Sequence, residues 1–334
     1  MYLLAPANSK EVAERLSWFR KPSALELSKK GIKFGLEIKE PLSYLKKAPD
    51  CYFGIHLPYE FATKWYYQPK RRKVMLKQVK KLGKLKPNYL VLHGIRIAFE
   101  PPARDYVHRY VATASGNEYL KLVRGYIKLV KELNKIAPVK IENLPLTTPY
   151  FKDGKYLPYT HLYSGTNRLN DLNYIKQKTG AGIILDTEHL ATVLNFLNRQ
   201  KNYQGLPVEK IEKPTLEDKH AQKIFGFYLK KYFIPYTDKK IKLEDFIKKL
   251  KAKHYHVTGS FQDVIPGKRI ASHGPISQDN KTFCQVLHMI LAQKPEAMLF
   301  ETANSTIGKT WKHLRKNETE ISFDNLCRIL LEEL

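Results

Sequence analysis

Short apolar runs alternate along the chain with longer segments in which apolar residues recur at helical spacing. The short runs predict eight strands, which are Tyr2–Ala5, Ala24–Leu27, Tyr52–His56, Tyr89–His93, Val139–Glu142, Gly182–Asp186, His254–Val257 and Ala297–Glu301. The longer segments predict amphipathic helices such as Lys10–Phe19, Arg72–Leu85, Asn117–Ile136, Leu243–Lys251, Lys281–Gln293 and Ser322–Leu334. Strands that alternate with helices favour the α/β class and a closed parallel (β/α)8 TIM barrel.

The length of the chain leaves room for insertions in such a barrel. It has 334 residues, whereas a typical barrel of this type needs about 250. We assign the excess to three loop insertions on the C-terminal face, at Arg96–Gly116, Pro145–Asn167 and Gln200–Lys240. No low-complexity tract or linker divides the chain, so we expect one barrel domain over residues 1–334.

Imidazole and carboxylate side chains gather at the carboxyl ends of six consecutive predicted strands. They are His56, His93, Glu142, Asp186, His256 and Glu301, with His189 just beyond the sixth strand and His273 in the loop after the seventh. In a barrel these strand ends surround one active-site mouth. Because buried charges need partners, the cluster predicts bound cations. Mixed imidazole and carboxylate ligands suit Zn²⁺, with Mn²⁺ and Fe²⁺ as alternatives.

The charge balance points to a polyanionic partner. Lys and Arg number 58 against 32 Asp and Glu, which gives a net charge of +26. Such an excess favours nucleic acid over an acidic membrane surface, although a lysine-rich surface can also arise from compositional drift. Basic and aromatic residues follow the predicted strand ends, and those we expect to bind DNA are Tyr59, Lys64, Trp65, Arg71, Arg96, Arg104 and Arg109. The alternative is that the aromatic residues only cap the barrel mouth.

Cysteine usage and the lack of targeting segments indicate the compartment. Cys51, Cys284 and Cys327 are far apart and form no CxxC pair, which is typical of a reduced protein. The N-terminal segment does not have the pattern of a signal peptide, and no run of about 18 apolar residues occurs. We therefore expect a cytoplasmic monomer that does not bind membranes.

Five short motifs lie at these strand ends in chain order. They read HLPY at His56–Tyr59, IEN at Ile141–Asn143, LDTEH at Leu185–His189, HVTGS at His256–Ser260 and ET at Glu301–Thr302. Together they resemble the endonuclease IV family of apurinic/apyrimidinic endonucleases (AP endonuclease family 2), which belongs to the xylose-isomerase-like TIM barrels. LDTEH is the most specific of the five. The resemblance extends from the third predicted strand to the eighth.

The resemblance implies a set of metal ligands. One ion would be held by His56, His93 and Glu142, and a second by Glu142 as a bridge, Asp186, His256 and Glu301. The family's third ion uses the histidine that matches His189 and an Asp-x-His pair, which here reads Ala271-Ser272-His273 and lacks the aspartate. We expect two zinc ions and leave the third open, with Asp263 or Glu188 as substitute ligands. Glu142 and Glu301 are the expected catalytic residues.

The implied reaction is hydrolysis of the phosphodiester 5′ to an abasic or damaged nucleotide in double-stranded DNA. In this reaction two metal ions share a hydroxide that attacks phosphorus, and the products are a 3′-hydroxyl and a 5′-deoxyribose phosphate. By the same resemblance, Tyr59 matches a tyrosine that enters the DNA stack. No Ser-His-Asp arrangement suggests a protein nucleophile.

Two other functions are consistent with the same residues. A sugar isomerase or epimerase of the same barrel superfamily would need a single Mn²⁺-type site, which Glu142, Asp186, His256 and Glu301 would supply. A nucleic-acid-binding protein without activity would keep a structural metal. His56 and His93 favour the nuclease because they build an additional metal site, and a charge of +26 has no use with a neutral sugar.

Overall fold

The computed structural model describes most of the barrel. The described residues are 1–39, 45–58, 69–94, 96–98, 116–143, 150–152, 155–157, 161–163, 169–190, 243–259, 274–302 and 318–334.

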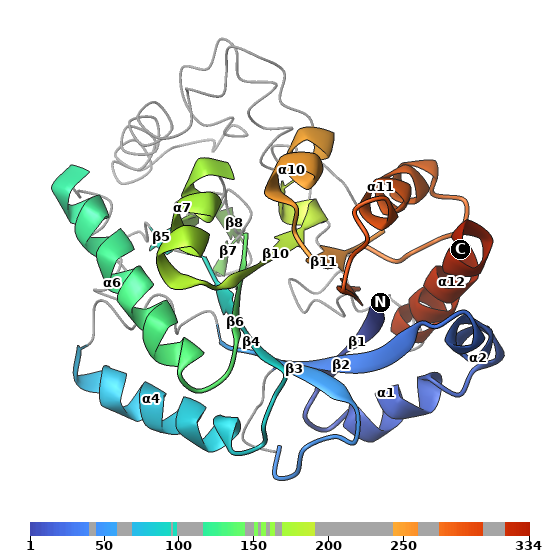
Figure 1. Cartoon of the computed structure of the whole chain (residues 1–334), viewed down its shortest axis with the longest axis horizontal. Helices are drawn as coiled ribbons and strands as arrows, with labels where there is room; N and C mark the ends of the chain where they lie inside the picture. The colour runs from blue at the N-terminus through green and yellow to red at the C-terminus, as the bar shows by residue number, and fades with distance from the viewer. Residues whose placement is uncertain are drawn as a thin grey trace.

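Eight parallel strands close into a barrel at the centre of the molecule (Figure 1). In chain order they are β1 (Tyr2–Asn8), β2 (Lys33–Lys39), β3 (Tyr52–His56), β4 (Tyr89–His93), β6 (Val139–Glu142), β10 (Gly182–Asp186), β11 (His254–Val257) and β12 (Ala297–Phe300). Each strand pairs with the next in this order, and β12 pairs with β1 to close the ring. The predicted (β/α)8 fold is confirmed.

Helices surround the strands on the outside of the ring (Figure 1). They are α1 (Val12–Trp18), α2 (Pro22–Lys29), α4 (Pro69–Gly83), α6 (Gly116–Asn134), α7 (Leu169–Thr179), α10 (Leu243–Leu250), α11 (Lys281–Leu291) and α12 (Glu318–Glu333). Their apolar faces pack on the outer faces of the strands; Trp18 of α1, for example, contacts Phe300 of β12 and Phe323 of α12. Within the described residues, we find no helix with the length and apolar character needed to cross a membrane.

The predicted second strand is wrong. Ala24–Leu27 lies in α2, where its first and last residues are buried while Leu25 is 49% exposed. This spacing of three is the helical period. Pro22 begins the helix, and Gly31 follows it with φ of 85°, a conformation that glycine adopts readily. The second strand is instead Lys33–Lys39.

Side chains alternate between the interior of the barrel and its helix-covered outside. On β2, Leu36 and Ile38 belong to the core beneath the helices, whereas Glu37 contacts side chains inside the barrel. A separate apolar cluster fills part of the interior and contains Leu4, Tyr89, Val91, Ile184, Ala297 and Leu299. Polar side chains occupy the interior toward the carboxyl ends of the strands, where the site lies.

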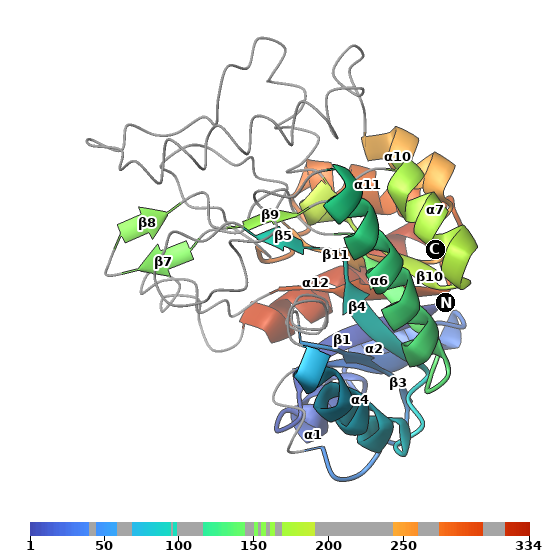
Figure 2. The same ribbon diagram turned by 90° about the vertical axis from the view of Figure 1, so that its left-hand side faces the viewer.

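Two small antiparallel sheets lie on the side of the barrel at which its strands have their carboxyl ends (Figure 2). β5 (Arg96–Ala98) pairs with β9 (His161–Tyr163), and β7 (Tyr150–Lys152) pairs with β8 (Lys155–Leu157). The first two predicted insertions therefore pair with each other. The third, Gln200–Lys240, lies outside the described residues, and the single-domain boundary stays a prediction.

Candidate metal centre

The structure brings the six strand-end side chains together at one end of the barrel. His56, His93 and Glu142 form one group of potential ligands, which we call the histidine site. Glu142, Asp186, His256 and Glu301 form a second, which we call the carboxylate site. In each group the potential ligand atoms all lie within 4.8 Å of one another. The parallel barrel explains this convergence, because all its strands end at the same rim.

Glu142 belongs to both groups, and its two oxygens face different partners. Its Oε2 lies 3.0 Å from Nε2 of His56 and 3.3 Å from Nε2 of His93. Its Oε1 lies 3.4 Å from Nδ1 of His256 and 3.5 Å from Nδ1 of His189. The carboxylate therefore lies between the histidine site and the carboxylate site, with one oxygen directed toward each.

The spacing of the carboxylate site fits a bound cation. Ligand atoms around a tetrahedral zinc ion, with bonds of about 2.0–2.1 Å, are separated by about 3.3–3.4 Å. Nδ1 of His256 lies 3.4 Å from Oε1 of Glu142 and 3.5 Å from Oε2 of Glu301. This buried nitrogen makes no hydrogen bond of good geometry with either oxygen. The three atoms therefore stand at about the separations that ligands of one zinc ion have.

Electrostatics also favour a cation. Burial acts to raise the pKa of Glu142, but the nearby imidazoles of His256, His93 and His56 outweigh it and hold that pKa well below its usual range. Burial likewise acts to lower the pKa of His256, but the carboxylates of Glu37 and Glu142 raise it to about 10. Without metal, a proton on His256 therefore balances the carboxylates. A metal ion would displace that proton.

Neighbouring residues fix the ends of the strands that carry the site. The side chain of Asn143 pairs with the backbone of Asp186, since its Nδ2 donates to the carbonyl at 3.0 Å and its Oδ1 accepts from the N–H at 2.7 Å. Oδ1 of Asp186 accepts from the backbone N–H of His189 at 2.7 Å. The hydroxyl of Tyr126 on α6 donates to the carbonyl of His93 at 2.8 Å. These contacts tie the end of β6 to that of β10, and the end of β4 to α6.

The proposed third ion has less support. Nδ1 of His189 lies 3.0 Å from the carbonyl oxygen of Asn143 and can donate to it. Among the residues that the structure describes, neither His189 nor Glu188 is part of a ligand group. His273 and Asp263 lie outside the described residues. The third site stays a prediction.

The predicted DNA-binding side chains lie outside the part of the chain that is described. Tyr59, Lys64, Trp65, Arg104 and Arg109 are not in the described ranges. Arg71 and Arg96 belong to α4 and β5, but only the backbone of each is described there. The predicted DNA contacts therefore stay predictions.

Sequence reasoning missed several polar residues of the barrel interior. Lys39, at the end of β2, forms an ion pair with Glu301. A cluster that contacts His256 consists of three buried residues, Glu37, Tyr89 and His254, and the half-buried Lys140. In the sequence, Phe34, Leu36 and Ile38 alternate with polar or small residues, a pattern that predicts a strand over Lys33–Lys39 with Glu37 and Lys39 on one face. The predicted strand at Ala24–Leu27 does not include these residues.

Comparisons with known proteins support the fold. No protein-family model and no curated protein matches the chain. A solved D-tagatose 3-epimerase-like protein is similar at a TM-score of 0.50 and 13% identity, over 98% of this chain and 97% of that one. Endonuclease IV from Thermus thermophilus has a TM-score of 0.48 and 13% identity, over 99% of both chains. An IOLI protein with a binding zinc atom has a TM-score of 0.48 and 12% identity, over 100% of this chain and 98% of that one.

Likeness at such low identity shows the barrel fold alone. The fold and the site together define the chain as a (β/α)8 barrel whose mouth carries clustered imidazole and carboxylate groups able to hold metal ions.

Proposed function

We propose that the chain is a zinc-dependent phosphodiesterase of the endonuclease IV type, which hydrolyses the DNA backbone 5′ to an abasic site. The observation that carries this proposal is the position of Glu142, whose Oε2 faces His56 and His93 while its Oε1 faces His256. A carboxylate placed in this way can bridge two cations. Two-metal centres of this kind are typical of enzymes that cleave phosphate esters.

Each residue of the site has a defined role in this proposal. When bound, two zinc ions would supply an activated water and neutralise the charge that develops on the phosphate. His56 and His93 would hold one ion, and Asp186, His256 and Glu301 the other. Glu142 would fix the separation between them. Lys39, whose side chain is 34% exposed and ion-paired with Glu301, adds a positive charge at the rim, where a phosphate oxygen can approach.

DNA is the proposed substrate because of the charge of the chain and the composition of its loops. A net charge of +26 suits a polyanion. The basic and aromatic residues predicted to bind DNA, such as Lys64 and Trp65, follow strand ends that carry the metal ligands. An abasic nucleotide has no base to unstack, so its extrusion into a site at the barrel mouth costs little.

A second candidate is a single-metal sugar isomerase or epimerase. The specific observation in its favour is that the carboxylate site is complete without His56 and His93, since Glu142, Asp186, His256 and Glu301 alone form a buried ligand group. In this alternative the histidine site would have no metal to hold. The two candidates therefore differ in the number of ions that the protein needs for turnover.

The test uses a duplex that contains one abasic site. The full chain, reconstituted with Zn²⁺ or Mn²⁺, is expected to produce a single nick on the 5′ side of the lesion. The new 3′-hydroxyl would be detected by polymerase extension, and a chelator should abolish the nick. Undamaged duplex is the substrate control. No chelator-sensitive nick, together with metal-dependent turnover of a ketose, would replace the proposal with the isomerase.

A matched pair of variants separates the site from the surface. His93→Gln removes a ligand of the histidine site and should lower nicking by about a hundredfold. His288→Gln changes a histidine on α11 whose side chain is 76% exposed, and should leave nicking unchanged. If both variants nick equally well, nicking does not depend on the histidine site and the proposal fails.

A further inference from the structure

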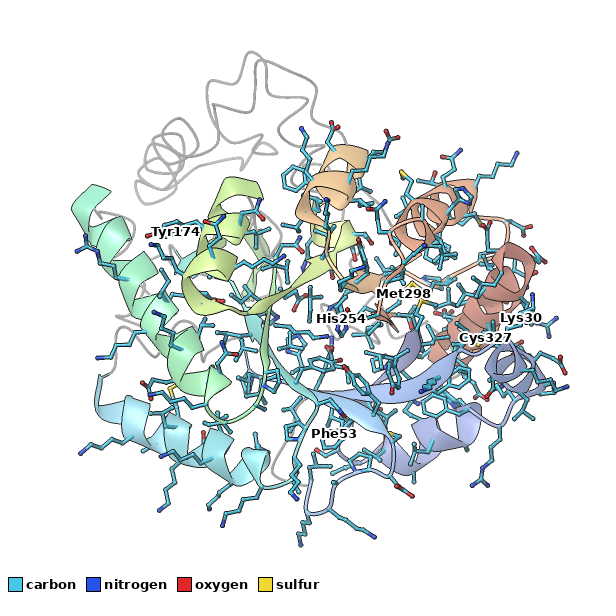
Figure 3. The ribbon with its side chains drawn as sticks, viewed as in Figure 1. Lys30, Phe53, Tyr174, His254, Met298 and Cys327 are labelled. Carbon is cyan, nitrogen blue, oxygen red and sulfur yellow. The ribbon has the colours of Figure 1, made fainter. Side chains whose placement is uncertain are left out.

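A second set of polar side chains lies inside the barrel next to the carboxylate site, and we call it the lower layer. It consists of Glu37 on β2, Tyr89 on β4, Lys140 on β6 and His254 on β11. Glu37 and Tyr89 are 0% exposed and His254 is 1% exposed. Figure 3 shows His254 within the ring of strands. A buried carboxylate is costly, so this arrangement requires a physical reason.

The contact between Glu37 and His256 joins the two layers. Oε2 of Glu37 lies 3.2 Å from Nε2 of His256 and accepts a hydrogen bond from the hydroxyl of Tyr89 at 2.9 Å. A carboxylate only accepts, so Nε2 of His256 must carry the proton. In the neutral ring the lone pair is then on Nδ1, which is the nitrogen that faces Glu142 and Glu301. The contact thus selects the tautomer that presents a ligand atom to the carboxylate site.

The same residues could instead hold an ion of their own, because Glu37, His254 and His256 form a compact ligand group. Two observations oppose this. Nζ of Lys140 lies 2.9 Å from Nδ1 of His254 and 4.6 Å from the ring centre of Tyr89, so the lower layer already contains a cation to balance Glu37. His256 also cannot give Nε2 to one ion and Nδ1 to another while it keeps a ring proton.

We infer that Glu37 is a positioning residue that holds His256 with Nδ1 toward the metal of the carboxylate site, and that Tyr89 orients Glu37. The inference rests on the metal centre of the proposed function but not on its substrate. Residues that hydrogen-bond to a metal-ligating histidine typically change metal affinity by about tenfold to a hundredfold when they are replaced.

The test measures metal binding by the full chain in the absence of DNA. Zinc affinity and stoichiometry are determined by competition with a chromophoric chelator, and Co²⁺ absorption reports the ligand geometry. Glu37→Gln is expected to weaken one of the two ions by about tenfold to a hundredfold and to shift its Co²⁺ spectrum, while the other ion binds as before. The matched control is Glu26→Gln on α2, which changes a carboxylate whose side chain is 56% exposed and should leave zinc affinity and the Co²⁺ spectrum unchanged.

A second variant keeps the inference testable if Glu37→Gln does not fold. Tyr89→Phe retains the charge of Glu37 and removes only the orienting hydroxyl, so it should weaken the same ion in the same direction by a smaller factor. Unchanged affinity and Co²⁺ spectra in every folded variant would overturn the inference. Loss of a third ion on replacing Glu37 would also overturn it, in favour of a metal site in the lower layer.

These outcomes are distinct from failure of the proposed function. A protein that binds two ions, depends on Glu37 for one of them and does not nick abasic DNA refutes the nuclease and supports the positioning role. A protein that nicks normally but binds metal equally well with and without Glu37 refutes the positioning role alone. Wild-type protein that binds no metal refutes both.

Discussion

The two halves of the metal centre differ in ligand type and in exposure. The histidine site offers two imidazoles and one carboxylate, and the side chain of His93 is 19% exposed. The carboxylate site offers one imidazole and three carboxylates, and none of its side chains is more than 7% exposed. The lower layer contacts the carboxylate site through His256.

The two proposed functions differ in their use of the histidine site. The carboxylate site is buried and complete, and it would serve an isomerase as well as a nuclease. The histidine site is closer to solvent and shares only Glu142 with the other half, and the proposed nuclease would use it for a second ion.

The largest effect is expected from Glu142→Gln, which changes the ligand common to both halves. The neutral amide cannot bridge two cations, so both ions should bind weakly and nicking should fall by about a thousandfold. Nicking rate and metal content per chain are the measurements. Glu132→Gln on α6, a carboxylate that is 36% exposed, is the matched control. Retention of both ions by Glu142→Gln would argue against a bridge.

His93→Gln should separate the two halves. The variant is expected to keep the ion of the carboxylate site and to lose the other, so that metal content falls from two ions to one and nicking falls by about a hundredfold. Metal analysis and the abasic-duplex assay check this. An isomerase would respond differently, because ketose turnover in the same variant would be unchanged.

The pH dependence of metal binding tests the carboxylate site directly. Because the pKa of His256 in the metal-free protein is about 10, its proton competes with the ion at every lower pH. Affinity of that site should therefore rise about tenfold per pH unit between pH 7 and pH 9, with release of about one proton. Calorimetry in buffers of different ionisation enthalpy measures the proton. Binding that is independent of pH would remove His256 from the site.

The smallest effect is expected at the rim. Lys39→Met removes the cation beside Glu301 but no ligand of either site. Because this ammonium is partly exposed, its contribution to phosphate binding is screened by water, and the specificity constant for nicking should fall by only about threefold to tenfold. Metal content should not change. If metal is lost instead, Lys39 orients Glu301 rather than the substrate.

The barrel could be predicted because most of its strands are short apolar runs that begin and end at turns or polar residues. The run Gly182–Asp186, for example, follows the turn at Gly180 and ends in a carboxylate, so both ends of the strand can be placed from the sequence. The four residues of Ala24–Leu27, three apolar and one charged, fit a strand or a helix equally well, so the pattern alone does not decide between them. Pro22 and the exposed side chain of Leu25 favour the helix, but exposure is known only once the helix has packed.

The candidate site was predictable for a topological reason. Once the strands are parallel, His56, Glu142 and Glu301 must meet at the rim wherever the helices lie. The structure places the six strand-end residues together, and their roles as ligands stay predictions until a metal is measured.

The lower layer could not be predicted in the same way. Glu37 stands between Leu36 and Ile38, an alternation that is typical of a strand whose polar face meets water, yet its side chain is fully buried. Its contact with Tyr89 depends on Gly54, where a Cβ atom would lie 2.1 Å from the tyrosine ring. The contact thus involves residues of three strands, β2, β3 and β4, which come together only in the folded barrel. A short stretch of sequence does not predict it.

The central claim is that Glu142 bridges two ions. Anomalous diffraction from crystals of the zinc-loaded protein tests it most directly. The account predicts two zinc peaks about 3.5–4 Å apart, one bound by Oε2 of Glu142 with His56 and His93, the other by Oε1 with His256. A single peak among Glu142, Asp186, His256 and Glu301, with His56 and His93 unligated in fully loaded protein, would contradict it.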